Sequence, residues 1–127
     1  MKRTIAAITM ILICVLSLCA CTPKENKIVK KYEDNGYIVG EIASSTLTLY
    51  GIDTKKTEYF FTANNVESGL KTVYVVVFKK NKDAKELYKR MSNEKNRAGE
   101  IIVKLKYVVS KKGKAVIFGM EDAVKLA

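Results

Sequence analysis

Residues 72–79 have the sequence TVYVVVFK, in which six apolar or aromatic side chains follow one another without interruption. In a β-strand, residues 73, 75 and 77 point to one side and residues 74, 76 and 78 point to the other. A strand that is apolar on both sides is typical of the centre of a sheet whose two faces are both covered. The segment therefore predicts a central, doubly covered strand.

Segment 58–63 (EYFFTA) is the predicted hairpin partner of this strand. Asn64-Asn65 and Ser68-Gly69 supply turn residues between the two segments. The consecutive aromatic residues 59–61 cannot all point to one face of a strand, so at least one of them faces outward or covers a second layer. We favour a core on both sides of the sheet over a ligand-stacking site.

Further helices and strands are predicted on either side of this hairpin. Helices are predicted at residues 27–35, 83–95 and 121–126, strands at residues 37–43, 46–52 and 115–119, and a turn at residues 111–114 with Gly113 at positive φ. Asp83 and Glu86 have the spacing of a capping box, and Arg97-Ala98-Gly99 is predicted to end the helix 83–95. Segment 101–110 fits a strand, and its first half also fits a helix.

These elements predict an α+β fold, with a mainly antiparallel sheet of about four to five strands and two or three helices packed on one of its faces. The chain of 127 residues allows one domain, which we assign to residues 27–127.

The first 20 residues have the pattern of a signal peptide. Lys2 and Arg3 precede an uncharged run of 16 residues from Ile5 to Ala20. A membrane-spanning helix needs about 20 apolar residues, whereas the apolar region of a secretory signal needs only about 7–15. We therefore predict a signal peptide at residues 1–20. The alternatives are a permanent N-terminal anchor helix and a buried core helix.

Leu18-Cys19-Ala20-Cys21 closes this run and resembles the bacterial lipobox, with Leu at −3, a small residue at −1 and Cys at +1. Cys19 stands at −2, where Ser, Ala or Thr is usual. The resemblance implies diacylglyceryl transfer to the Cys21 sulfur and cleavage between Ala20 and Cys21. Two acyl chains are enough for stable membrane attachment. The expected location is the extracytoplasmic face of the cell membrane, with residues 21–26 as a lipidated tether.

The remainder of the chain also carries a resemblance. The segments VYVVVFKKNKDAKELYKRM and KYVVSKKGKAVIFGMEDAVKLA are similar to small lipoproteins of Gram-positive bacteria. The similarity covers most of residues 27–127, and its motifs are caps, turns and core stripes. It implies no catalytic residue.

The composition excludes several kinds of site. The chain has no His, and its 3 Cys lie at positions 14, 19 and 21. Beyond residue 21 there is thus neither a thiol nor an imidazole, which excludes Cys/His and Ser/His catalysis, the usual zinc sites, and haem ligation by His or Cys. We predict no catalytic residue, no metal site and no cofactor.

The predicted function is a non-enzymatic binding or structural module, with a protein, a peptide or a wall component as its ligand. The alternative is a carboxylate-based hydrolase that acts on the cell envelope. That enzyme would need two Asp or Glu side chains about 5–10 Å apart in a concave pocket.

The chain is strongly basic, with 23 Lys+Arg, 13 Asp+Glu and a formal charge of +10. Lys82, Lys85 and Lys89 have the spacing i, i+3, i+7 and form one stripe on the predicted helix 83–95. They are candidates for contact with anionic lipid or an anionic wall polymer; the alternative is an ordinary solvated surface. Because export separates the chain from nucleic acid, we predict no nucleic-acid partner. Such a partner would require the signal-peptide interpretation to be wrong.

Overall fold

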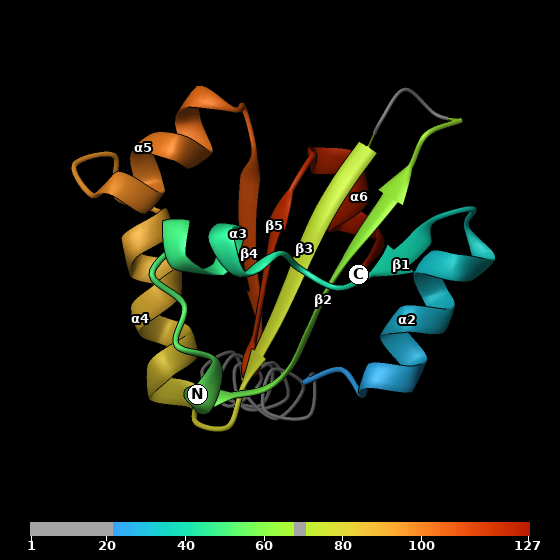
Figure 1. Cartoon of the computed structure of the whole chain (residues 1–127), viewed down its shortest axis with the longest axis horizontal. Coiled ribbons are helices and arrows are strands. Elements are labelled where there is room, and N and C mark those ends of the chain that lie inside the picture. Colours follow the sequence, from blue (N-terminus) through green and yellow to red (C-terminus); the bar gives the residue numbers. More distant parts are fainter. Residues whose placement is uncertain (1–21, 68–70) are drawn as a thin grey trace, which may run out of the picture.

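A largely buried strand, β3 (Lys71–Phe78), occupies the centre of a five-stranded antiparallel sheet (Figure 1). The structure is a computed structural model, and it describes residues 22–67 and 71–127. The other strands are β1 (Ile38–Gly40), β2 (Thr57–Asn65), β4 (Val108–Lys112) and β5 (Ala115–Gly119), in the spatial order β1-β2-β3-β5-β4. The α+β fold and the antiparallel sheet predicted from the sequence are confirmed.

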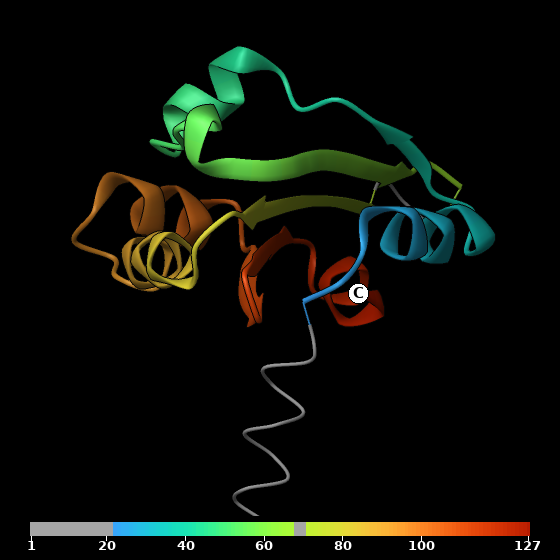
Figure 2. The same ribbon diagram turned by 90° about the horizontal axis from the view of Figure 1, so that it is seen from below.

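Helices cover both faces of this sheet. The described residues form the α-helices α2 (Glu25–Asp34), α3 (Ser44–Leu49), α4 (Asn81–Met91), α5 (Arg97–Lys104) and α6 (Glu121–Leu126), and the 3-10 helix η1 (Thr54–Lys56). Figure 2 shows α2 and α6 together on one side of the molecule and α4 and α5 together on the other. The prediction that all helices lie on one face is therefore wrong. The two-sided apolar pattern of β3 had indicated the correct arrangement.

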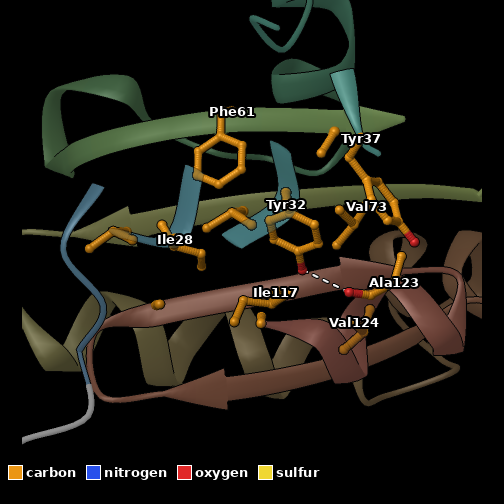
Figure 3. Close-up of a cluster of buried hydrophobic side chains, with 13 residues drawn as sticks. Ile28, Tyr32, Tyr37, Phe61, Val73, Ile117, Ala123 and Val124 are labelled. Carbon is orange, nitrogen blue, oxygen red and sulfur yellow. Dashed lines mark hydrogen bonds between the residues drawn. The ribbon is translucent and has the colours of Figure 1, made fainter. Parts of the chain in front are cut away.

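The first core lies between the sheet and the pair α2 and α6 (Figure 3). Tyr32 of α2 is completely buried, and its hydroxyl donates a hydrogen bond of 2.7 Å to the backbone oxygen of Ala123 in α6. The rings of Tyr37 and Phe61 contact the Tyr32 ring edge-on, with centroid distances of 5.2 and 6.2 Å. Tyr32 thus joins helices from the two ends of the domain.

The second core lies between the opposite face and helices α3, α4 and α5. Phe118 of β5 is completely buried there, between the rings of Tyr50 at 4.8 Å and Tyr74 at 5.1 Å. The aromatic run in β2 divides between the two cores, because Tyr59 and Phe61 belong to the first and Phe60 to the second. The preference for a core on both sides of the sheet is confirmed.

The segment predicted as a strand at residues 46–52 forms helix α3 instead, and the strand predicted at residues 37–43 is only the three-residue β1. Leu47 and Leu49 had suggested the alternation of apolar and polar side chains that is typical of a strand. In the structure Leu47 and Tyr50, at the helical spacing i, i+3, point into the second core, and Leu49 is exposed. Burial of Tyr50 against Phe118 thus outweighs the alternating pattern of the segment.

Gly99 does not end a helix, as the sequence predicted, but lies in the first turn of α5. A Cβ atom at this position would overlap the backbone oxygen of Asn93, just after the end of α4. The glycine therefore allows the two helices to approach closely, and the helical alternative for the first half of segment 101–110 is confirmed. The predicted capping box is wrong: Lys80 is the N-cap of α4, and Asp83 lies inside the helix.

Both cores consist of residues between Ile28 and Ala127, so the domain has a hydrophobic core of its own. The exact spans predicted for β5 and α6 are confirmed, and Gly113 has the expected positive φ of 56°.

We predict that Gly99→Ala destabilises the domain by about 1–3 kcal/mol, because the added methyl group forces the α4–α5 connection apart. Gly40→Ala is the matched control, since a Cβ at Gly40 would meet no atom within 4 Å. Urea unfolding of both variants measures the difference. Equal stability of the two variants would contradict the close approach at Gly99.

Candidate functional site

Two pairs of lysines meet at one end of the sheet. Thr57 at the start of β2 is the register partner of Phe78 at the end of β3. The pairing continues one step further, where the Lys79 backbone N–H donates to the Lys56 oxygen at 2.9 Å. Antiparallel pairing therefore places Lys55-Lys56 beside Lys79-Lys80.

These lysines surround a surface hollow of about 240 Å³, which we call the lysine hollow. Its walls come from η1, from the β3–α4 connection and from the first turn of α4. The lining residues are Lys55, Lys56, Lys79, Lys80, Lys82 and Asp83. Five lysines thus line the hollow together with one aspartate.

Asp83 offsets only part of this positive charge. Its carboxylate is 4.0 Å from Lys56 Nζ, and its side chain is 10% exposed, against 56% for Lys56. Within residues 22–67 and 71–127, the other four lysines of the hollow form no salt bridge. The start of α4 adds the positive end of a helix dipole at the same place, and its N-cap Lys80 makes no side-chain hydrogen bond to the helix. The hollow therefore suits an anion.

The three lysines predicted from the sequence are all exposed on α4, but they do not act as one group. Lys82 lines the lysine hollow. Lys85 lies near Lys111 of β4, where burial and then the charge of Lys85 lower the pKa of Lys111. The described contacts place Lys89 in neither group. Of the predicted stripe, only Lys82 thus lines the hollow, while Lys85 lies near the β4–β5 hairpin.

The contribution of Lys55 and Lys56 was not predicted from the sequence. The signal was present, because the predicted hairpin of segments 58–63 and 72–79 brings the residues before the first strand beside those after the second. Aligning the two lysine pairs across that hairpin would have identified the hollow.

The first described residues are bound at this same end of the sheet. The Lys114 backbone N–H donates to Thr22 Oγ1 at 3.0 Å, and the Tyr59 hydroxyl donates to the Pro23 oxygen at 2.6 Å. Lys114 lies beside the end of β3, since its oxygen accepts from the Phe78 N–H at 2.9 Å. Figure 1 shows η1 and the starts of α2 and α4 at one end of the sheet. We call this the lysine-rich end.

Carboxylates gather at one other hollow, of about 310 Å³, where Glu25 and Glu58 line the surface together with Tyr59. Both glutamates are exposed. Burial, followed by the charges of the two glutamates, raises the pKa of Tyr59 to about 12. In the described part of the chain, no group of three or more Asp or Glu side chains is placed to hold a metal ion.

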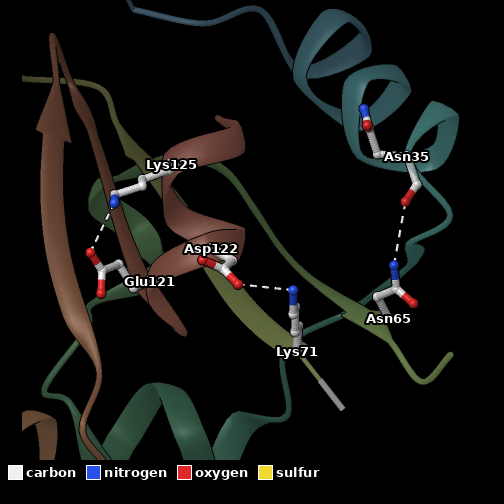
Figure 4. Close-up of polar contacts among 6 residues, drawn as sticks. All are labelled: Asn35, Asn65, Lys71, Glu121, Asp122 and Lys125. Carbon is white, nitrogen blue, oxygen red and sulfur yellow. Dashed lines mark hydrogen bonds and ion pairs between the residues drawn. The ribbon is translucent and has the colours of Figure 1, made fainter. Parts of the chain in front are cut away.

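The acidic pair Glu121 and Asp122 forms ion pairs on the surface of α6 (Figure 4). Lys125 Nζ lies 2.9 Å from Glu121, and Lys71 Nζ donates to Asp122 at 2.9 Å. This bond lowers the pKa of Asp122 and raises that of Lys71. These carboxylates are helix-end charges with lysine partners.

The predicted lipidation residue Cys21, the cleavage site after Ala20 and the signal peptide 1–20 lie outside the described residues. Among the residues that are described, no helix has the length and apolar character needed to cross a membrane. Comparison with protein-family models, with curated proteins and with solved structures found no match to this chain.

We predict that Lys85→Gln raises the pKa of Lys111, because it removes a like charge from a partly buried ammonium group. A lysine with a lowered pKa in the folded state destabilises the fold while it is protonated. That destabilisation is present below its folded pKa and disappears as the pH rises through this pKa toward the unfolded value. NMR titration of the lysine side chains measures the shift. Lys104→Gln, on α5, is the control and should leave Lys111 unchanged.

Proposed function

We propose that this chain is a lipid-anchored protein of the extracytoplasmic face of the cell membrane, acting as a non-enzymatic binding or structural module. The observation that carries the proposal is Leu18-Cys19-Ala20-Cys21, which follows a basic start and an uncharged run of 16 residues. A thiol in this place is the group that a lipobox requires for acylation, and a second acyl chain makes the attachment stable.

The position of Thr22 gives the proposal a geometric consequence. Thr22 follows Cys21 directly and is bonded to the β4–β5 hairpin through Lys114. Consecutive Cα atoms are about 3.8 Å apart. Acyl chains on Cys21 would therefore start next to the lysine-rich end of the domain, and this end would lie nearest the lipid headgroups.

The proposed partners follow from this location. The membrane is bound through acylated Cys21, and the exposed lysines offer contacts to anionic lipid or to an anionic wall polymer. A protein or peptide partner fits the proposed binding role. Nucleic acid is not proposed, because the domain would lie outside the cytoplasm.

A carboxylate-based hydrolase acting on the cell envelope is the second candidate, and the hollow lined by Glu25 and Glu58 is the observation that favours it. Glycoside hydrolysis uses one carboxyl group as a general acid, and burial is the usual means of keeping that group protonated. Both glutamates are exposed to solvent. This supports the binding module over the enzyme.

We predict that Cys21→Ser abolishes acylation and leaves residues 1–20 attached, because serine offers no thiol for lipid transfer. Mass spectrometry of the N-terminal peptide and gel mobility measure both effects. Cys19→Ser is the matched control, since serine is usual at −2, and it should be processed normally. An unmodified Cys21 in the unaltered chain would contradict the proposal.

For the hydrolase alternative, we predict that purified cell-wall glycan releases no more soluble fragments with the unaltered protein than with Glu58→Gln. Exposed carboxylates lack the environment of a general acid. Glu100→Gln, an exposed glutamate on α5, is the control. Release by the unaltered protein and by Glu100→Gln, but not by Glu58→Gln, would establish the enzyme instead.

A further inference from the structure

We infer that the lysine hollow binds the phosphate groups of anionic phospholipids, so that the domain docks on the membrane by its lysine-rich end. The inference rests on the proposed lipid anchor and deepens it. It assigns a defined surface and a defined chemistry to the contact between the domain and the bilayer.

The charge of the hollow is the first argument. Five lysines converge from three segments, and the single carboxylate, Asp83, is already occupied by Lys56 at 4.0 Å. Several like charges around one hollow attract an anion more strongly than a single charge does. Lysine is a flexible point charge that binds phosphate well. The hollow is open and has the volume of about eight water molecules, which is room for a hydrated phosphate group.

The position of the hollow is the second argument, and it selects lipid over a free anion or a wall polymer. Thr22 and Pro23 are bonded to Lys114 and Tyr59 at the lysine-rich end. A chain anchored at residue 21 therefore holds this end beside the headgroups. Attachment through one end raises the effective concentration of headgroups at the hollow, whereas a soluble polymer has no such advantage.

The neighbouring hairpin extends the same surface. Lys111 lies close enough to Lys85 to feel its charge, and Lys114 is bonded to Thr22. An anionic surface under this end would relieve the repulsion between Lys85 and Lys111. The contact thus involves the hollow first and the β4–β5 hairpin beside it.

The absence of tryptophan from the chain allows a direct test on the full-length protein. Thr54→Trp places a fluorescent probe beside Lys55 in η1, and Val66→Trp places one after β2, at the opposite end of the sheet. The nine residues of β2, joined by eight steps of about 3.3 Å, separate these ends by about 26 Å. Both native side chains are exposed, so the probes should be tolerated.

Each variant is reconstituted in nanodiscs of phosphatidylcholine alone or with phosphatidylglycerol, and a nitroxide on the lipid headgroup quenches nearby indole rings. We expect stronger quenching of the Thr54→Trp probe than of the Val66→Trp probe in anionic nanodiscs. The difference should shrink at 1 M salt, where the Debye length falls to about 3 Å.

Neutralising the lysines of the hollow is the second part of the test. Lys55→Gln, Lys79→Gln and Lys82→Gln are combined, while Lys56 is kept because it faces the nearly buried Asp83. Each lysine near an anionic surface shifts the equilibrium between orientations by about fivefold. In the triple variant, the ratio of molecules with the lysine-rich end on the bilayer to molecules in other orientations should therefore fall by about a hundredfold. Lys95→Gln, Lys104→Gln and Lys106→Gln, around α5, remove the same charge and should change nothing.

Three outcomes overturn the inference. The first is equal quenching of the two probes in anionic nanodiscs, and the second is the same quenching difference between the probes in neutral nanodiscs. The third is an equal loss of this quenching difference in the two triple variants. A response of the Thr54→Trp probe to soluble polyphosphate, with none to anionic nanodiscs, also overturns it and assigns the hollow to a wall-type polymer.

Mass spectrometry of the same samples reports acylation of Cys21. A chain without acyl groups that still shows the quenching difference overturns the lipid anchor and leaves the lysine contact standing.

Discussion

Burial of β3 on both faces is the constraint on which the rest of the structure depends. Val73, Val75, Val76 and Val77 are all completely buried, and each contributes about 1.5–3 kcal/mol to folding when removed from water. Neither face can be left to solvent, so helices must cover both. Tyr32 strengthens one of these layers, because its buried hydrogen bond to α6 would leave an unpaired backbone oxygen if it were lost.

The same strand pairing creates the charged end of the domain. The register that buries β3 aligns Thr57 with Phe78, and the lysine pairs just outside the strands then have to meet. Positive charge is therefore concentrated at this end of the sheet, and among the described residues the only carboxylate that lines the lysine hollow, Asp83, lies near Lys56. This concentration of charge in one hollow, where scattered charges would serve solubility equally well, is the observation behind the proposed anionic ligand.

The elements predicted correctly are those whose local sequence pattern fits only one type of secondary structure. The span of β5, a buried apolar run after a glycine turn, was predicted correctly, as was the pairing of β2 with β3. Helix α3 was missed because the burial of Tyr50 depends on Phe118, 68 positions later. The role of Gly99 depends on the backbone at Asn93, and no local pattern shows such an approach. The lysine hollow was missed for a different reason, since it required combining a predicted hairpin with charges outside it.

A lipid anchor and a charged surface act on different properties of the domain, because the anchor sets its membrane affinity and the charge sets its orientation. Acyl chains on Cys21 would supply nearly all of the membrane affinity, so lysines add little to attachment. A domain held by one residue can still rotate about its tether, and an asymmetric charge selects one orientation. With the lysine-rich end on the bilayer, the exposed side chains of Ile38 and Val66 lie at the far end of the sheet. The position of the charge, rather than its total, then decides which surface faces the environment.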